Sequence, residues 1–256
     1  MNGITLKKRT GTANGLLAAT KLLLAVLLLC IVCALTFALV RFMSGEGKTA
    51  STAALATPKM PVIVIDAGHG GMDSGAVGAD GTLEKEINLS VSRKLAALCS
   101  LSGIEYVMTR TEDQMLVDDS VTSHKKMHDL KNRLKITQEM SEAGREVIFV
   151  SIHMNNFPSP KYSGLQVWYS QNEPQGKELA AFIQGYAKTW LDSANTRQIK
   201  AATSAIYVLD RATVPAVLVE CGFLSNPEEC KKLGDDDYQT ELAVTVFSAL
   251  CEFLTK

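Results

Sequence analysis

The sequence lacks an excess of charge of either sign. Its 26 lysine and arginine residues are balanced by 27 aspartate and glutamate residues, which leaves a net charge of -1. Proteins that bind nucleic acid need a basic surface to neutralise phosphates, so this balance argues against a nucleic-acid partner. No internal repeat is visible. The 256 residues are enough for one large globular domain or two small ones.

The sequence also has few cysteines, and their spacing shows no pairing pattern. Two of the six, Cys30 and Cys33, lie in an apolar run near the N-terminus. The other four form no CxxC pair and no dense disulfide framework: Cys99, Cys221, Cys230 and Cys251. We expect these four to be buried free thiols, and a disulfide between two of them is the alternative.

Charge is absent altogether from residues 22–40, LLLAVLLLCIVCALTFALV. At about 1.5 Å per residue, a helix of this length nearly spans a hydrocarbon core of about 30 Å. Basic residues precede the run more often than they follow it: Lys7, Lys8, Arg9 and Lys21 before it, Arg41 and Lys48 after it. The positive-inside rule therefore predicts a cytoplasmic segment at residues 1–21 and a transmembrane anchor at 22–43, with the rest of the chain outside.

Two alternatives to an anchor compete for this run. A cleaved signal peptide usually has an apolar core of about 7–15 residues, which is shorter than the run observed here. A lipoprotein site at Cys30 would need small residues before the cysteine, but three leucines stand there. The retained anchor is the interpretation that we favour. The small, polar residues 44–60 that follow predict a linker.

From residue 61 onward, short apolar runs alternate with stretches of helical periodicity. Five strands are predicted, at residues 62–65, 106–108, 147–152, 165–169 and 216–219. Helices are predicted at about 85–101, around 127–134 and 179–190, at 227–233 with Asn226 as cap, and from Asp237 as cap to the C-terminus. This alternation predicts a single three-layer α/β domain at 61–256, with a mostly parallel twisted sheet flanked by helices.

Residues that can carry chemistry follow the predicted strands. The first strand leads into Asp66 and His69, the third into His153, and the last into Glu220, while Glu84 stands at the start of the first helix. In parallel sheets the carboxyl ends of the strands meet at one edge, where active sites gather. These side chains are therefore expected to lie near one another.

The glycine-rich turn after the first strand, VIVIDAGHGGMDSGA, does not fit a phosphate-binding loop. A dinucleotide fingerprint needs G-x-G-x-x-G, but Asp73 occupies the last glycine position, and the next helix begins only near residue 85. Glycines on both sides of His69 instead allow a tight turn that leaves its imidazole accessible.

Two imidazoles and one carboxylate form the ligand set of a catalytic zinc site, and a further carboxylate is then needed to move protons. His69, His153, Glu84 and Glu220 supply this set. Hydrogen-bonded loop histidines and solvated glutamates are the alternative. Asp66 and Asp73 are candidates for contacts to the ligands rather than for ligation.

The motifs IDAGHGGMDSGAVG, GTLEKEINL, VSIHMNN and PAVLVECGFLSNPEE resemble, in this order, those of the zinc-dependent N-acetylmuramoyl-L-alanine amidases (the Amidase_3 family). The resemblance covers about residues 61–255. It implies that His69, Glu84 and His153 bind zinc and that Glu220 is the catalytic carboxylate. The sequence has Ala67 where the family commonly has proline, which affects only the rigidity of the turn.

The resemblance implies hydrolysis of the amide between N-acetylmuramic acid and the L-alanine of peptidoglycan stem peptides. Arg110 and Arg133 are candidates to meet a peptide carboxylate, with a structural ion pair as the alternative for each. Asn155 is the third candidate substrate-binding residue.

Within the family, the chain is most similar to the membrane-anchored, germination-specific (CwlD-type) amidases of spore formers. This implies a role in the spore cortex that leads to muramic δ-lactam, a location in the forespore intermembrane space or the cell wall, and a possible activating protein partner. Another zinc peptidoglycan hydrolase, such as a carboxypeptidase, and a non-catalytic anchored wall-binding domain are the alternatives.

A second pair of histidines, His124 and His128, is spaced four residues apart on a predicted helix. Lys125 stands where an HExxH zinc motif has glutamate, and further lysines lie nearby. We therefore expect a solvated helix face there.

Overall fold

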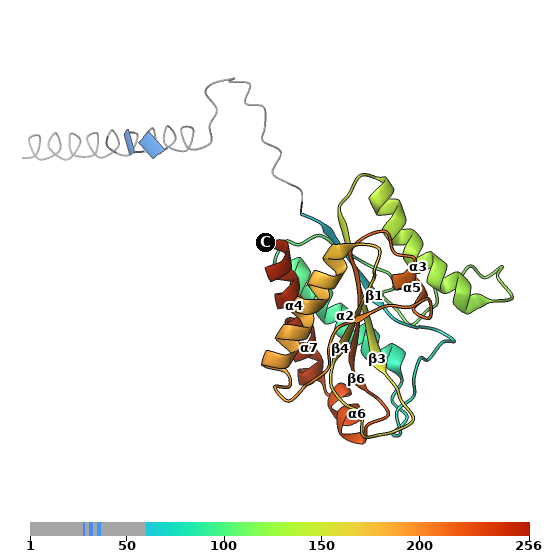
Figure 1. Ribbon diagram of the computed structural model, residues 1–256. Helices are drawn as coiled ribbons and strands as arrows, with labels where there is room; N and C mark the ends of the chain where they lie inside the picture. Colours follow the sequence, from blue (N-terminus) through green and yellow to red (C-terminus); the bar gives the residue numbers. More distant parts are fainter. Residues whose placement is uncertain (1–27, 29–30, 33–34, 37–59) are drawn as a thin grey trace, which may run out of the picture. The chain divides into compact units, whose positions relative to one another are not determined.

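The computed structural model describes residues 28, 31–32, 35–36 and 60–256 (Figure 1). The chain divides into two units, residues 1–57 and 58–256. In the first unit the described residues are helical. Among all the residues that the structure describes, no helix is long and apolar enough to cross a membrane. The predicted anchor at 22–43 lies mostly outside these residues, and so does the predicted linker, so both stay predictions.

A six-stranded sheet forms the centre of the second unit, with the strand order β2-β1-β3-β6-β4-β5. The strands are β1 (Val62–Ala67), β2 (Tyr106–Met108), β3 (Val147–Asn155), β4 (Gln166–Tyr169), β5 (Lys200–Ala201) and β6 (Ala216–Phe223). Four of the neighbouring pairs are parallel, and only β4 runs antiparallel to β6. The prediction of a mostly parallel sheet is confirmed.

The strands at the centre of the sheet are buried on both faces. Every residue of β1 is buried, and so are the first six residues of β3. Their near-continuous runs of valine and isoleucine are typical of parallel strands that are covered by helices on both sides. The sequence had predicted all of these strands except the short β5.

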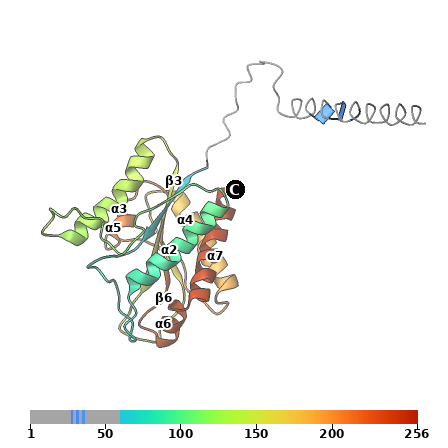
Figure 2. The same cartoon turned by 180° about the vertical axis from the view of Figure 1, so that it is seen from behind.

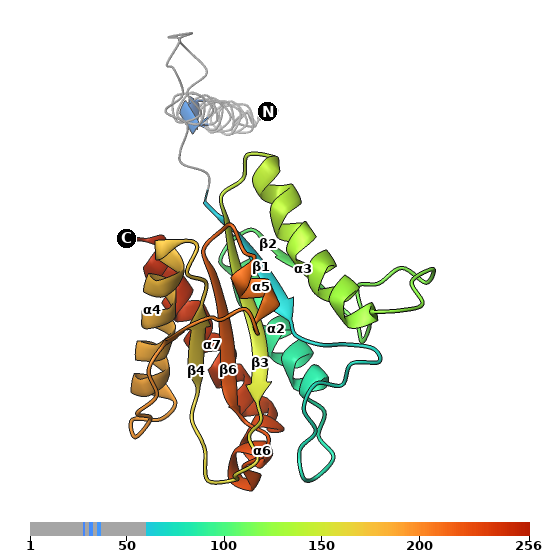
Figure 3. The ribbon, with the colours of Figure 1, turned by 45° about the vertical axis from the view of Figure 1, so that its right-hand side comes forward.

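Helices cover both faces of this sheet. The helices α2 (Glu84–Leu101), α4 (Pro174–Trp190) and α7 (Asp236–Leu254) pack on one face, where they share a core with Ile63 and Ile65 of β1 (Figure 2). The opposite face packs against α3 (Lys125–Glu142) and the short α5 (Tyr207–Asp210), around Val64 and Phe149 (Figure 3). Residues 60–256 therefore form a three-layer α/β domain, as predicted.

The sequence predicted an N-terminal cap for each of the last two helices, and one of these two predictions is correct. The helix α6 (Pro227–Leu233) begins after Asn226, whose side chain accepts hydrogen bonds from the backbone N–H groups of Glu228 and Glu229, as predicted. The predicted cap of α7, Asp237, is wrong. Asp235 caps this helix by accepting from the N–H of Tyr238, because Asp235 has extended backbone angles while Asp237 already lies inside the first turn.

The four cysteines of the described region are free. Three of them are buried (Cys99, Cys221 and Cys230), and Cys251 is partly buried. The expectation of free thiols is therefore confirmed.

Candidate active site

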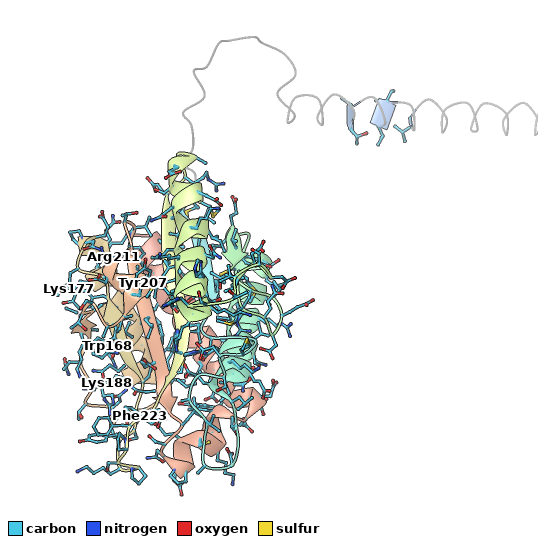
Figure 4. The ribbon with its side chains drawn as sticks, turned by 90° about the vertical axis from the view of Figure 1, so that its right-hand side faces the viewer. Trp168, Lys177, Lys188, Tyr207, Arg211 and Phe223 are labelled. Carbon is cyan, nitrogen blue, oxygen red and sulfur yellow. The ribbon has the colours of Figure 1, made fainter. Side chains whose placement is uncertain are left out.

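The register of the sheet brings distant residues together. His153 of β3 lies opposite Glu220 of β6, and Asp66 of β1 lies opposite Ser151 of β3. Because residues paired across neighbouring strands point to the same face, these side chains lie on the side of the sheet that carries α3. Figure 4 views the molecule from this side and labels Trp168 of β4 and Phe223 at the end of β6.

His69 lies in the loop after β1, with a strained backbone. Its φ angle is +60°, a left-handed conformation that few residues other than glycine adopt. The two glycines that follow, Gly70 and Gly71, also have positive φ angles, of 138° and 55°. The loop can therefore reverse direction within three residues and hold the imidazole of His69 beside the end of the sheet.

The two histidines and Glu84 meet at one point. The Nε2 atom of His69 lies 3.2 Å from Oε1 of Glu84, and Nδ1 of His153 lies 2.9 Å from the same oxygen. The planes of the two imidazole rings are inclined at 74°, with ring centroids 4.9 Å apart. One ligand atom from each residue lies within 4.8 Å of the other two, so the group could hold a metal ion.

This arrangement fits a tetrahedral zinc ion. At bond lengths of about 2.0–2.1 Å, ligand atoms of such an ion lie about 3.4 Å apart, close to the separations from Glu84 observed here. The other nitrogen of His69, Nδ1, lies 2.8 Å from Oδ2 of Asp73, the kind of outer contact that orients a metal-bound histidine. Asp73 therefore contacts His69, a candidate ligand.

The charges of the group favour a bound cation. Burial acts to lower the pKa of His69, but its hydrogen bonds with Asp73 and Glu84 outweigh burial and raise that pKa to about 9. Burial acts to raise the pKa of Glu84, but the two histidines hold it well below its usual range. The hydrogen bond with His69 likewise holds the pKa of Asp73 below its usual range. Glu84 and Asp73 are thus both ionised at neutral pH, and their negative charges favour a cation beside them.

Glu84 is held firmly in its position. It is the first residue of α2 and is 3% exposed. Its Oε2 atom accepts a hydrogen bond of 2.7 Å from the N–H of Ala76, and Oε1 accepts one of 3.1 Å from the N–H of Met154. Glu86, two residues further on, is exposed and belongs to no metal-binding group among the described residues.

Glu220 lies beside the histidines and does not belong to the ligand group. Its Oε2 atom is buried and has no hydrogen-bond partner in the described part of the chain. Burial raises the pKa of Glu220 to about 7, with the nearby His153 opposing the rise and Glu84 adding to it. A carboxylate with a pKa near neutrality is suited to accept a proton and to release it again.

The structure does not place Arg110 and Arg133 where they could meet a substrate. Each is only 1% exposed. Arg133 forms ion pairs with Asp66 and Asp129, and Arg110 donates to backbone carbonyls. Arg133 therefore forms the structural ion pair that the sequence had left open as its alternative, whereas Arg110 forms no ion pair among the described residues. The burial of both side chains opposes the prediction that either binds a peptide carboxylate. Their burial could not be read from the sequence.

Asn155 is partly buried at the end of β3, opposite Phe223 of β6. Its role in binding substrate stays a prediction. His124 and His128 are exposed, and they belong to no metal-binding group among the described residues.

Gly68 lies in the turn that the sequence predicted, but the sequence did not show that it packs against His153. A Cβ atom at this position would lie 2.2 Å from Nε2 of His153. The ring of His153 therefore packs directly on the backbone of Gly68. This contact joins residues far apart in the sequence, so no local pattern indicates it.

Comparisons with known proteins identify similar amidases. The sequence profile of the family described as N-acetylmuramoyl-L-alanine amidase matches residues 63–252. The germination-specific N-acetylmuramoyl-L-alanine amidase of Bacillus subtilis (strain 168) is 34% identical over 197 residues, which cover 76% of this chain and 80% of that protein.

Solved structures are similar as well. The CwlD amidase from Clostridioides difficile, in complex with the GerS lipoprotein, matches with a TM-score of 0.71 and 39% identity, covering 76% of this chain and 98% of that chain. The amidase AmiC2 of Nostoc punctiforme matches with a TM-score of 0.64 and 29% identity, covering 77% of this chain and 98% of that chain.

Substituting Gly68→Ala is predicted to displace His153, because the added methyl group overlaps its ring. We expect the affinity for Zn²⁺ to fall by about 10–100-fold, as for other changes that shift a ligand. Gly185→Ala is the matched control, since a Cβ there meets nothing within 4 Å and alanine favours the helix. Competition with a chromophoric chelator measures both affinities. Equal affinity in Gly68→Ala and wild type would show that His153 does not bind the metal at this position.

Glu220→Gln is predicted to stabilise the metal-free protein above neutral pH. Between pH 4.5 and about 7 the folded state keeps the proton of Glu220 while the unfolded state loses it, so stability falls as pH rises through this range. The loss amounts to at most about 3 kcal/mol, and glutamine avoids it. Urea unfolding in the presence of a chelator at pH 5 and pH 8 measures the difference, with the exposed Glu241→Gln as control. A variant no more stable than wild type at pH 8 would contradict the raised pKa.

Proposed function

The chain belongs to the N-acetylmuramoyl-L-alanine amidase family, and we propose that it uses zinc to hydrolyse the amide between N-acetylmuramic acid and the L-alanine of peptidoglycan stem peptides. The observation that carries this proposal is the meeting of His69, Glu84 and His153 within 4.8 Å of one another. The neighbouring Glu220 is the acid–base group that such a hydrolysis needs.

In this proposal His69, Glu84 and His153 hold the zinc ion. When bound, zinc supplies Lewis-acid activation of the scissile carbonyl group and of water. Asp73 keeps Nε2 of His69 turned toward Glu84 through its contact with Nδ1. Glu84 is kept in place by the N–H groups of Ala76 and Met154, so the ligands are oriented before a metal binds.

Glu220 moves the protons of the reaction. The oxygen of water forms a bond to the carbonyl carbon of the lactyl group, and Glu220 takes up a proton of that water. As the bond from carbon to nitrogen breaks, Glu220 transfers the proton to the nitrogen of L-alanine. The products are the lactyl carboxylate and a stem peptide with a free amino group. A pKa raised to about 7 by burial allows both transfers.

We further propose that the protein acts on the spore cortex, where removal of stem peptides precedes formation of muramic δ-lactam. The similarity to a germination-specific amidase of Bacillus subtilis supports this setting. The similar CwlD amidase was solved in complex with the GerS lipoprotein, which supports a protein partner for this chain. The apolar run at residues 22–40 supports a membrane anchor, with the catalytic domain outside the cytoplasm.

Glu220→Gln is predicted to lower kcat by about 10²–10⁴-fold while zinc content stays at the wild-type level, because the variant keeps the ligands and loses the proton acceptor. Turnover of purified peptidoglycan by the full chain, with zinc content measured on the same samples, tests this. Removal of zinc by a chelator should abolish activity, and added zinc should restore it. Glu241→Gln is the control.

The products of the same reaction separate the proposal from its alternatives. Release of intact stem peptides that begin with L-alanine supports an amidase. Loss of terminal residues alone would show a carboxypeptidase, and absence of turnover with zinc bound would show a binding domain.

The anchor and the cellular setting make a separate prediction. The full chain should stay in the membrane fraction after a salt wash, whereas residues 45–256 should not, because only the full chain contains the apolar run. A mature protein shortened by about 40 residues would instead show a cleaved signal peptide.

Deletion of the gene in a spore former should remove muramic δ-lactam from cortex muropeptides, and unchanged lactam would contradict the cortex role.

A further inference from the structure

Arg110 is a buried cation that has no carboxylate partner among the described residues. It follows β2 and is 1% exposed, and no ion pair in this part of the chain includes it. Its guanidinium group donates only to backbone carbonyls. Nε donates to Ala67 at 2.9 Å, Nη1 to Glu112 at 3.0 Å, and Nη2 to both Gly68 at 3.0 Å and Lys85 at 2.7 Å.

Burying a charge in this way is costly. A buried ion loses its hydration, and carbonyl groups replace that hydration only in part. Burial, together with the neighbouring Arg133, lowers the pKa of Arg110 to about 10. Arg110 still carries its charge at neutral pH. Arg133, in contrast, is balanced by Asp66 and Asp129.

The contacts of Arg110 join the two segments that carry the first two metal ligands. Gly68 directly precedes His69, and Lys85 directly follows Glu84. A single nitrogen, Nη2, binds the carbonyls of both residues. This nitrogen therefore ties the loop after β1 to the first turn of α2, across the place where His69 and Glu84 lie 3.2 Å apart.

Arg133 binds the same loop, and its hydrogen bonds do not extend to α2. Its Nη1 donates to the carbonyl of Ala67 at 2.7 Å, and its Nη2 donates to that of His69 at 2.6 Å. Two buried arginines thus bind three successive carbonyls, those of Ala67, Gly68 and His69. Of the hydrogen bonds that the two arginines form in the described part of the chain, only the one from Arg110 to the carbonyl of Lys85 reaches the helix that begins with Glu84.

The loop is also shaped around Arg110. A Cβ atom on Gly70 would lie 3.1 Å from both Cδ and Nε of Arg110 and 2.3 Å from the carbonyl oxygen of Gln114. Gly70 has a φ angle of +138°, which disfavours any other residue. The backbone after His69 therefore passes close against the arginine side chain.

We propose that Arg110 is a positioning residue that sets the spacing between the metal ligands His69 and Glu84. The inference rests on the proposed function, because it assumes that these two residues bind zinc. Arg110 touches neither ligand side chain and acts through the backbone on either side of them. Its three nitrogens donate to four carbonyls, those of Ala67, Gly68, Lys85 and Glu112, whereas lysine has one nitrogen with three donors and cannot bind all four.

Arg110→Lys tests the proposal, because it keeps the positive charge and removes the fork. We expect the full chain with this change to bind Zn²⁺ about 10–100-fold more weakly, as is typical when an outer contact of a metal site is lost. The visible spectrum of the Co²⁺-loaded protein should change, since it reports ligand geometry. Arg145→Lys is the matched control. Arg145 forms a two-pronged ion pair with Glu105 and precedes the start of β3, whereas His153 lies near the end of that strand, so its replacement should leave both readouts unchanged.

Arg110→Met is the second variant, because it avoids burying an ammonium group that has too few partners. Weaker Zn²⁺ binding in either variant, with cooperative urea unfolding retained, supports the proposal. Wild-type affinity and an unchanged Co²⁺ spectrum in a folded variant would overturn it. Loss of cooperative unfolding in both variants would also overturn it, since Arg110 would then be needed for the fold as a whole. If the wild-type chain itself binds no Zn²⁺, the proposed function fails, and that result does not depend on the variants.

Discussion

The backbone hydrogen bonds that join β3 to β1 and to β6 determine where the residues of the site lie. Parallel pairing puts the carboxyl ends of these strands at one edge of the sheet, and the register sets His153 opposite Glu220. A shift of one residue along any of these strands would turn the corresponding side chain to the opposite face of the sheet, into the core beneath α2, α4 and α7. The continuous burial of β1 and β3 strongly opposes such a shift.

Hydrogen bonds made by buried side chains next to the candidate ligands hold the segments at this edge of the sheet together. Asp66, buried at the end of β1, accepts hydrogen bonds from Thr109, Ser151 and Arg133. In the described part of the chain it forms no hydrogen bond with a candidate ligand, and it links β1 to β3 and α3 instead. The carbonyls after Asp66 are bound by two arginines, so the loop that carries His69 is held through its backbone. These hydrogen bonds to the loop backbone can maintain the positive φ angle of His69, which is otherwise unfavourable.

Several features of the site lower stability, and each is related to its chemistry. Glu220 has a buried oxygen without a hydrogen-bond partner, and burial raises its pKa toward neutrality. Arg110 is buried without a carboxylate partner, and His69 adopts a backbone conformation that few residues favour. A domain that served only as a stable scaffold would gain by replacing these groups. Their presence at one edge of the sheet is what a site prepared for a cation and a proton transfer requires.

The sequence by itself determined five of the six strands, most of the helices and the candidate residues of the site. Strand runs rich in valine and isoleucine and helical periodicity are local properties, so they can be read without a structure. His69, Glu84, His153 and Glu220 could be selected because they stand at strand ends and match ordered motifs. Tertiary structure alone decided the rest. It buried Arg110 and Arg133, which the sequence had offered as substrate contacts, and it pressed His153 against Gly68. Three successive aspartates, Asp235 to Asp237, could each cap α7, and the backbone angles of the folded chain decided that Asp235 does so. Burial and close packing depend on which distant segments meet, and no local pattern contains that information.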